Sequence, residues 1–284
     1  MIFSDSFEAS AAGDASAGVY SAGSVFGQAP DVVGYASSPW INPGRGVDSA
    51  RVIEDGLTYK GYGGSGGAIE VSESANFAQF VRGGDLNLGE LFAPDGTGTL
   101  FVSALVQPDS NDPSRVAVSL ATNGDPGGAF IFGSAIPGQG GSSAGDGEIV
   151  TNFGGEITLS GELLNPGRPN LLVMQINVTA ESGGGEANDD VFIYLNPDLS
   201  RPLDTSSAII RVSGVDLIRD STPVGQFQFQ VGGNAEGTTL IVDELRIGTS
   251  FDSMDPEPGG MALAASTGVL YWVRRRGARH AGLS

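Results

Sequence analysis

The sequence predicts an all-β protein, a two-sheet antiparallel sandwich followed by a short apolar helix at the C-terminus. Three observations support this. Glycine (45) and proline (15) punctuate the 284 residues, and this spacing favours short strands joined by turns. The apolar segments between them are short and are alternating or β-branched. Only one continuous apolar stretch, near the C-terminus, is bounded by charged residues.

The clearest strands show a period of two. In Gln226–Val231 two phenylalanines point to one side and the glutamines to the other. No body segment shows the apolar stripe of a helix, so an antiparallel sandwich is the simplest solution. The predicted strands are Phe3–Phe7, Thr99–Gln107, Arg115–Thr122, Ala129–Phe132, Leu171–Thr179, Val191–Leu195, Ala208–Val212, Gln226–Val231 and Thr238–Ile247. The first and last of these are predicted to be antiparallel neighbours, and residues 11–67 to form long loops over the sandwich edge.

Charge is distributed unevenly. The net charge is −19, and all 33 acidic residues lie at or before Glu257. Ten basic residues precede residue 259, so the body carries −23, and the four remaining arginines give the tail +4. Because a body this acidic repels polyanions, it excludes nucleic-acid binding. The absence of cysteine excludes disulfides and thiol chemistry.

The C-terminal segment has three parts in a fixed order. Pro256, Glu257 and Pro258 precede an uncharged stretch, Gly259–Val273, and the cluster Arg274, Arg275 and Arg276 follows it. As a helix the stretch would be ~22 Å long, and the arginines would keep their end cytoplasmic. The alternative is a buried helix of the body, which would leave the arginine cluster unexplained. We therefore expect a body over residues 1–252, a linker over 253–258 and a sorting tail over 259–284.

This order of motif, apolar stretch and arginine cluster resembles the PEP-CTERM sorting signal. The resemblance implies an exported protein, held transiently in the inner membrane until an exosortase-type enzyme cuts near the motif. The protein would then reach the cell surface or the extracellular matrix, where exopolysaccharide is a candidate partner. Met1–Asp5 has neither a basic start nor an apolar run, so no N-terminal signal peptide is predicted within this chain.

The body resembles the concanavalin A-like, LamG-type jelly roll at three short segments. Phe3–Phe7 is similar to its opening strand, Tyr194–Asp198 to the turn after its long central strand, and Val242–Phe251 to its closing strand. The resemblance implies a lectin-like or glucanase-like sandwich whose terminal strands lie side by side.

The residue inventory argues against an enzyme. The only histidine, His280, lies beyond the sorting motif, so the body offers no histidine base or metal ligand. A glycoside hydrolase needs only two carboxylates, and a divergent one remains the alternative function. However, Glu156 and Glu162 lack the middle acid of the pattern usual on this fold. Asp243 and Glu244 are adjacent on a strand and would point to opposite faces; Asp243 is expected to brace the closing strand.

Glycan binding is the favoured function of the body. Trp40 lies in a loop rich in glycine and proline near Tyr35, Tyr59 and Tyr62, and these four aromatic side chains are candidate glycan contacts. The alternative for Trp40 is that it caps the sandwich edge. No cofactor is expected, although Asp109, Asp112 and Asp125 are weak calcium candidates whose alternative is turn formation. The sequence thus favours an exported, non-catalytic surface or matrix protein.

Overall fold

The structure is a computed structural model. It describes residues 3–5, 9–10, 20–21, 23–24, 50–60, 62–63, 67–72, 79–85, 97–109, 115–122, 125–134, 148–153, 156–179, 189–215, 224–232 and 239–254. The chain divides into two units, Met1–Met254 and Asp255–Ser284. The sorting motif, the apolar stretch and the arginine cluster therefore lie outside the described residues. Across the described part, no helix has the length and apolar character needed to cross a membrane.

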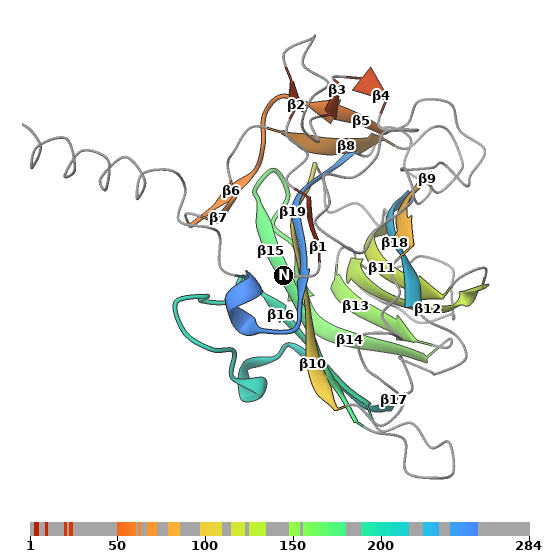
Figure 1. Ribbon diagram of the computed structural model, residues 1–284, viewed down its shortest axis with the longest axis vertical. Helices are drawn as coiled ribbons and strands as arrows, with labels where there is room; N and C mark the ends of the chain where they lie inside the picture. The colour runs from red at the N-terminus through yellow and green to blue at the C-terminus, as the bar shows by residue number, and fades with distance from the viewer. Residues whose placement is uncertain are drawn as a thin grey trace, which may run out of the picture. The chain divides into compact units, whose positions relative to one another are not determined.

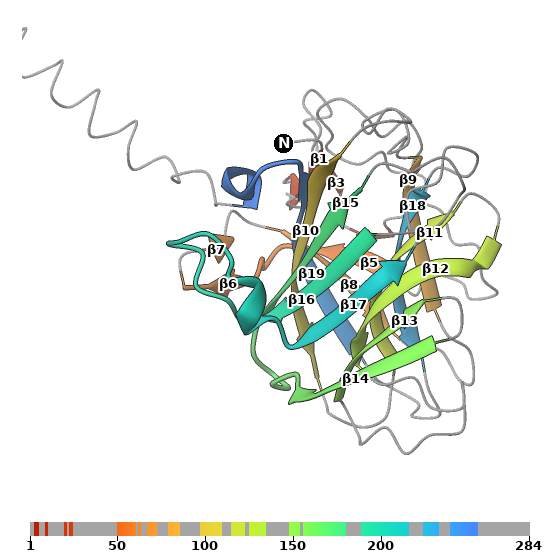
Figure 2. The same ribbon diagram turned by 90° about the horizontal axis from the view of Figure 1, so that it is seen from below.

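The described residues are mostly β-strand, as predicted. One sheet of nine strands has the order β17 (Ile210–Val215), β16 (Asp189–Leu195), β15 (Asn170–Val178), β10 (Gly98–Pro108), β19 (Thr239–Gly248), β8 (Ala68–Ser72), β5 (Ala50–Ile53) and β4 (Gly23–Ser24), with β1 (Phe3–Asp5) also on β19. Figures 1 and 2 both show β10, β15 and β16 side by side in this sheet.

A second sheet has six strands. In spatial order these are β14 (Glu156–Leu163), β13 (Glu148–Phe153), β12 (Asp125–Ser134), β11 (Arg115–Thr122), β18 (Val224–Gly232) and β9 (Gln79–Asp85). Two small pairs complete the described strands: β2 (Ala9–Ser10) with β3 (Tyr20–Ser21), which is parallel, and the hairpin of β6 (Thr58–Tyr59) and β7 (Tyr62–Gly63). Every other pairing is antiparallel, and the helical residues described are the 3-10 turns η1 (Thr205–Ser207) and η2 (Phe251–Met254).

The predicted pairing of the two ends of the body is confirmed. Phe3 lies opposite Ile247 and Asp5 opposite Leu245, so β1 and β19 are antiparallel neighbours. The prediction of long loops over residues 11–67 missed the strands of this stretch, since β5 extends the large sheet and the β6–β7 hairpin lies in the same stretch. The predicted linker also begins too early. Ser253 and Met254 are buried in η2, so the body reaches Met254.

The strand register gives the nine-stranded sheet two chemically different faces. Side chains alternate along a strand, so Val102 and Ala104 on β10 share one face and Ser103 and Leu105 the other. The aliphatic face consists of buried apolar side chains: Ile69, Val71, Leu100, Val102, Ala104, Val106, Leu172, Met174, Ile176, Val178, Val191, Ile193, Leu240, Val242, Leu245 and Ile247. The polar face carries Thr99, Phe101, Ser103, Leu105, Val173, Gln175, Asn177, Asp190, Phe192, Tyr194, Ile241, Asp243 and Arg246. All the candidate chemistry described below lies on or beside the polar face.

Candidate functional site

A β-bulge in β19 brings acidic side chains together on the polar face. Ser103 pairs with Arg246 and Leu105 with Asp243, so two residues of β19 oppose Ala104. Glu244 takes a left-handed backbone conformation there, with φ of 49°. Such a bulge interrupts the alternation of side chains, and Asp243 and Arg246 consequently share one face. The expectation that adjacent Asp243 and Glu244 cannot converge is therefore wrong.

The side chains at this bulge form a buried charged cluster. Glu244 Oε2 accepts hydrogen bonds from Arg246 Nη2 at 2.7 Å and Nε at 3.2 Å. The guanidinium carbon lies 5.0 Å from the centre of the Tyr62 ring, and the Tyr62 hydroxyl hydrogen-bonds with Ser103 Oγ at 2.7 Å. Asp243, Glu244 and Arg246 are only 1%, 5% and 7% exposed. Their charges are therefore satisfied inside the protein rather than presented to a ligand.

This cluster fixes the β6–β7 hairpin onto the polar face. Asp243 Oδ2 accepts a hydrogen bond from the Leu57 backbone N–H at 2.7 Å, and its Oδ1 accepts one from the Glu244 N–H at 2.7 Å. Asp243 thus braces the closing strand, as predicted, and also ties it to the residue that precedes the hairpin. Tyr62 is 3% exposed, and burial raises the pKa of its phenol well above the ordinary value. Its ring contributes to packing, so it presents no open face on which a sugar could stack.

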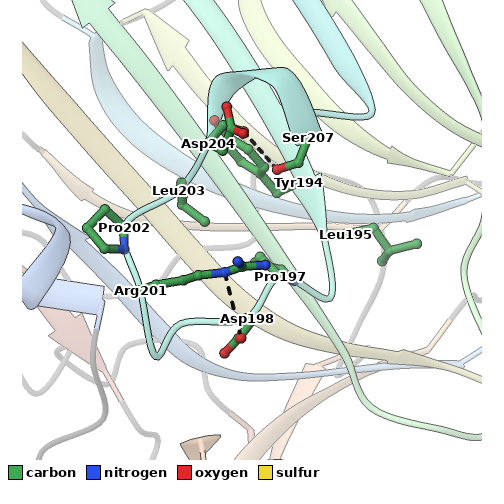
Figure 3. Close-up of a pocket in the computed structure, with 9 residues that line it drawn as sticks. All are labelled: Tyr194, Leu195, Pro197, Asp198, Arg201, Pro202, Leu203, Asp204 and Ser207. Carbon is green, nitrogen blue, oxygen red and sulfur yellow. Dashed lines mark hydrogen bonds and ion pairs between the residues drawn. The ribbon is translucent and has the colours of Figure 1, made fainter.

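A pocket of about 310 Å³ lies beside this hairpin, at the end of β16. Its volume is near the lower end of the range for small-molecule sites, about 300–1,000 Å³. A single chain segment supplies its walls: Tyr194, Leu195, Pro197, Asp198, Arg201, Pro202, Leu203, Asp204 and Ser207. Figure 3 shows Arg201 extending across the site, with Asp204 and Asp198 on opposite sides of it.

Asn196 sets the direction of the chain as it enters the pocket segment. Its φ of 53° is left-handed, a conformation that asparagine tolerates better than most residues. Its N–H donates to the Leu171 carbonyl at 2.7 Å, and its side-chain oxygen accepts from the Leu171 N–H at 2.8 Å. The Tyr59 hydroxyl donates to the Asn196 carbonyl at 3.4 Å. The turn is thereby joined to β15 on one side and to the hairpin on the other.

Both pocket carboxylates are held ionised. Asp204 caps η1, and it accepts hydrogen bonds from the Ser206 N–H at 2.8 Å and the Ser206 hydroxyl at 2.6 Å. The bonds from Ser206 lower the pKa of Asp204, and hydrogen bonds from Ser200 lower the pKa of Asp198 in the same way. At neutral pH the pocket therefore offers two hydrogen-bond acceptors and no protonated carboxylic acid.

Cations balance these carboxylates. Arg201 Nε lies 3.8 Å from Asp198 Oδ2, and its side chain is 78% exposed, so this ion pair is weak. Lys60 lies at the hairpin turn, 4.9 Å from the centre of the Tyr59 ring, and interacts electrostatically with Asp198. Beside proline and leucine walls, this mixture of donors and acceptors suits a polar, uncharged small molecule.

The remaining predicted site residues are dispersed. Tyr59 is half-buried next to the pocket, whereas Trp40 and Tyr35 lie outside the described residues. Asp109 is exposed and braces β19 by accepting a hydrogen bond from the Thr239 N–H at 2.9 Å. Asp112 and the side chain of Asp125 lie outside the described part, within which no group of three metal-ligating side chains occurs.

Sequence reasoning missed the pocket itself. In the sequence, Tyr194–Asp198 supports the fold alone, and no predicted site includes Arg201 or Asp204. The signal present was a strand ending in an aromatic residue and followed by turn formers, Asn-Pro-Asp and then Arg-Pro-Leu-Asp. A turn this rich in proline and aspartate is a reasonable place for a binding loop.

No protein-family model matches the chain, and no curated protein matches it in sequence. Among solved structures it is similar to an endo-β-1,4-glucuronan lyase from the fungus Trichoderma reesei, with 12% identity over 75% of this chain and 92% of that one and a TM-score of 0.41. The cellulose induced protein Cip1 has 14% identity over 75% and 91%, with a TM-score of 0.44. The binding domain of botulinum neurotoxin DC, in complex with rat synaptotagmin II, has 10% identity over 82% of this chain and 51% of that one, with a TM-score of 0.44. At such values the likenesses carry no argument about the function of this chain.

Proposed function

We propose that this protein is an exported, non-catalytic surface or matrix protein that binds a glycan in the pocket at Tyr194–Ser207. The observation that carries the proposal is the composition of the pocket. Two ionised carboxylates and an arginine surround walls of tyrosine, leucine and proline. Sugar hydroxyls both donate and accept hydrogen bonds, and the C–H faces of a sugar ring pack on apolar walls.

The same carboxylates argue for binding rather than hydrolysis. A glycosidase needs one carboxylic acid whose raised pKa keeps it protonated near the reaction pH. In the pocket the pKa values of Asp198 and Asp204 are shifted the opposite way. Asp243 and Glu244 share a face but are buried, where they hold a backbone N–H and an arginine.

The sandwich architecture belongs to this proposal. The large sheet has a face made mostly of buried aliphatic side chains, with the buried Asn170 and Asp189 at its margin, and such a face needs a second layer to cover it. Strands of the two sheets contact each other, β14 with β17 and β8 with β18. We infer that the six-stranded sheet covers the aliphatic face in a jelly-roll sandwich. On the polar face, the side chains of Leu57 and Tyr62 at the β6–β7 hairpin cover part of the sheet, so the pocket and the strands beside it are the part left for recognition.

A glycan array tests the binding function. The full chain should bind neutral glycans, and Asp204→Asn should weaken binding at least about tenfold, since a hydrogen bond to a charged group is lost. Asparagine still caps η1, so the fold should be retained. Asp55→Asn removes the same charge at an exposed position away from the pocket and is the matched control. Binding of no array glycan, or equal binding by both variants, would refute the function.

The tail is proposed to sort the protein. The order of Pro256–Pro258, the uncharged stretch and Arg274–Arg276 supports a segment processed at the inner membrane. In a bacterium that carries an exosortase, deletion of residues 255–284 should abolish membrane retention while the body stays folded. Replacing Arg274–Arg276 with glutamine should disturb retention, whereas Arg279→Gln should not. If the deletion unfolds the body, the segment is part of its core and the sorting role is wrong.

A further inference from the structure

The pocket continues onto an exposed part of the polar face. We name as the β15–β17 strip the six side chains Gln175, Asn177, Asp190, Phe192, Arg211 and Ser213. The register places them in two cross-strand rows, Gln175–Phe192–Arg211 and Asn177–Asp190–Ser213. Arg211 and Ser213 are exposed and the other four are half-exposed. Figure 2 shows β15, β16 and β17 lying side by side.

The strip is connected to the pocket by hydrogen bonds. Tyr194, which lines the pocket, donates its hydroxyl to Gln175 Oε1 at 3.3 Å, and Gln175 Nε2 donates to Asn177 Oδ1 at 2.9 Å. Arg211 Nη2 donates to the Ser206 carbonyl at 2.7 Å, next to the pocket residue Ser207. The pocket and the strip are therefore adjacent and joined by hydrogen bonds through Tyr194 and Arg211.

The dimensions of this surface exceed those of the pocket. Residues two apart on a strand lie about 6.6 Å apart, so the Asn177 row is about 13 Å from the Tyr194 row. Amide, carboxylate, guanidinium and hydroxyl groups surround one aromatic ring, Phe192, which packs on one side against the buried cluster around Tyr194 and is only partly exposed. On the opposite face the same strands bear mainly buried aliphatic side chains such as Met174 and Ile193.

We propose that the ligand is a neutral glycan chain, with one unit in the pocket and the following units along the β15–β17 strip. This rests on the proposed glycan-binding function and adds the length and charge of the ligand. Phe192 packs against the C–H face of a sugar ring, and Asn177 and Gln175 hydrogen-bond its hydroxyls. The strip contributes one carboxylate, Asp190, and one guanidinium, Arg211. Since the whole chain carries −19, it repels acidic polysaccharides.

Titration calorimetry of the full chain tests this proposal. The probes are β-linked oligomers of glucose, mannose and N-acetylglucosamine, from the disaccharide to the hexasaccharide. Affinity should rise with length. Asn177→Ala should weaken the hexasaccharide about fivefold through a lost hydrogen bond. Phe192→Leu, which keeps an apolar side chain but removes the aromatic ring, should weaken it by a similar factor. Asn177→Ala should not change disaccharide binding, because the second sugar unit reaches the Phe192 row but not the Asn177 row, about 13 Å from Tyr194.

Asn165→Ala is the matched control. Asn165 is exposed in the turn before β15. That strand begins at Asn170, and seven residues, about 23 Å, separate Asn170 from Asn177 in the strip. The control therefore lies beyond the end of the strand that is remote from Asn177. The disaccharide could bind in a way that depends on Asp204 while affinity does not rise with chain length. That result would refute the proposed role of the strip and leave the function of the pocket standing. The proposed role of the strip would also be refuted if Asn177→Ala lowered the affinity for oligomers of every length by the same factor. Binding of no probe at all would overturn the strip and the function together.

Discussion

Replacing Arg246 with methionine removes the only cation of the described charged cluster and leaves its carboxylates buried. Methionine keeps an unbranched, apolar side chain of similar length, so the change is chiefly one of charge. Glu244 then loses two hydrogen bonds, at 2.7 and 3.2 Å, and the Tyr62 ring loses the guanidinium that lies 5.0 Å from its centre. Breaking a buried ion pair from one side costs about 3–5 kcal/mol, a large part of the 5–15 kcal/mol of a typical domain.

The prediction has a closely matched control within the same sheet. Arg51 pairs with Glu70 at the same N–O distance, 2.7 Å, but its side chain is 61% exposed, whereas that of Arg246 is 9% exposed. Urea unfolding followed by circular dichroism gives the free energy of unfolding of each variant. Arg51→Met should cost far less than Arg246→Met, because water screens an exposed pair.

A double variant separates loss of charge balance from loss of packing. Arg246→Met combined with Glu244→Gln removes both charges and should recover most of the stability, since replacing a whole buried ion pair is often nearly neutral. The reasoning is refuted if Arg246→Met costs no more than Arg51→Met. It is also refuted if the double variant is as unstable as the single one, because the cost would then come from packing alone.

Two further predictions concern the hairpin and the pocket floor. A Cβ added at Gly56 would lie 3.0 Å from Asp243 Oδ2 and 3.1 Å from the Gly67 carbonyl oxygen. Gly56→Ala should therefore lower the free energy of unfolding by about 1–3 kcal/mol. An unchanged melting temperature would contradict this. Burial raises the pKa of Tyr194 in the folded protein to about 12, whereas in the unfolded chain it is about 10. The favourable contribution of the neutral phenol to the free energy of unfolding should therefore be complete below pH ~10 and be lost as the pH rises toward 12. The free energy of unfolding of the wild type should therefore fall relative to that of Tyr194→Phe across that range, and parallel pH profiles would rule the effect out.

The strands could be predicted because their signal is local. The alternation in Gln226–Val231 falls within β18, and the β-branched run Thr99–Gln107 coincides with β10 to within one residue at each end. The pairing of β1 with β19 is a long-range contact, and its prediction rests on the strand-like pattern at both ends of the body, with which the fold resemblance agrees.

The bulge at Glu244 could not be predicted from its own residues. Left-handed backbone in a strand normally calls for glycine or asparagine, and neither occurs between Val242 and Ile247. The conformation follows from tertiary pairing, because β10 fixes the register on both sides of Ala104 and leaves one residue of β19 in excess. Two adjacent acidic residues therefore appeared to alternate across the sheet when they in fact meet on one face.

The charged cluster and the pocket are linked through the β6–β7 hairpin. The buried cluster can therefore affect the position of the pocket segment although it does not line the pocket. Asp243 holds the Leu57 N–H, and Tyr62 is held by Ser103, so both ends of the hairpin are tied to the sheet by directional hydrogen bonds. Its middle then meets the pocket segment, where Tyr59 donates to the Asn196 carbonyl, 137 residues along the chain. Hydrophobic packing alone would hold the hairpin against the sheet but would allow it to slide, since it is non-directional. The hydrogen bonds fix the position of the hairpin and, through the Tyr59–Asn196 bond, of the turn that leads into the pocket segment.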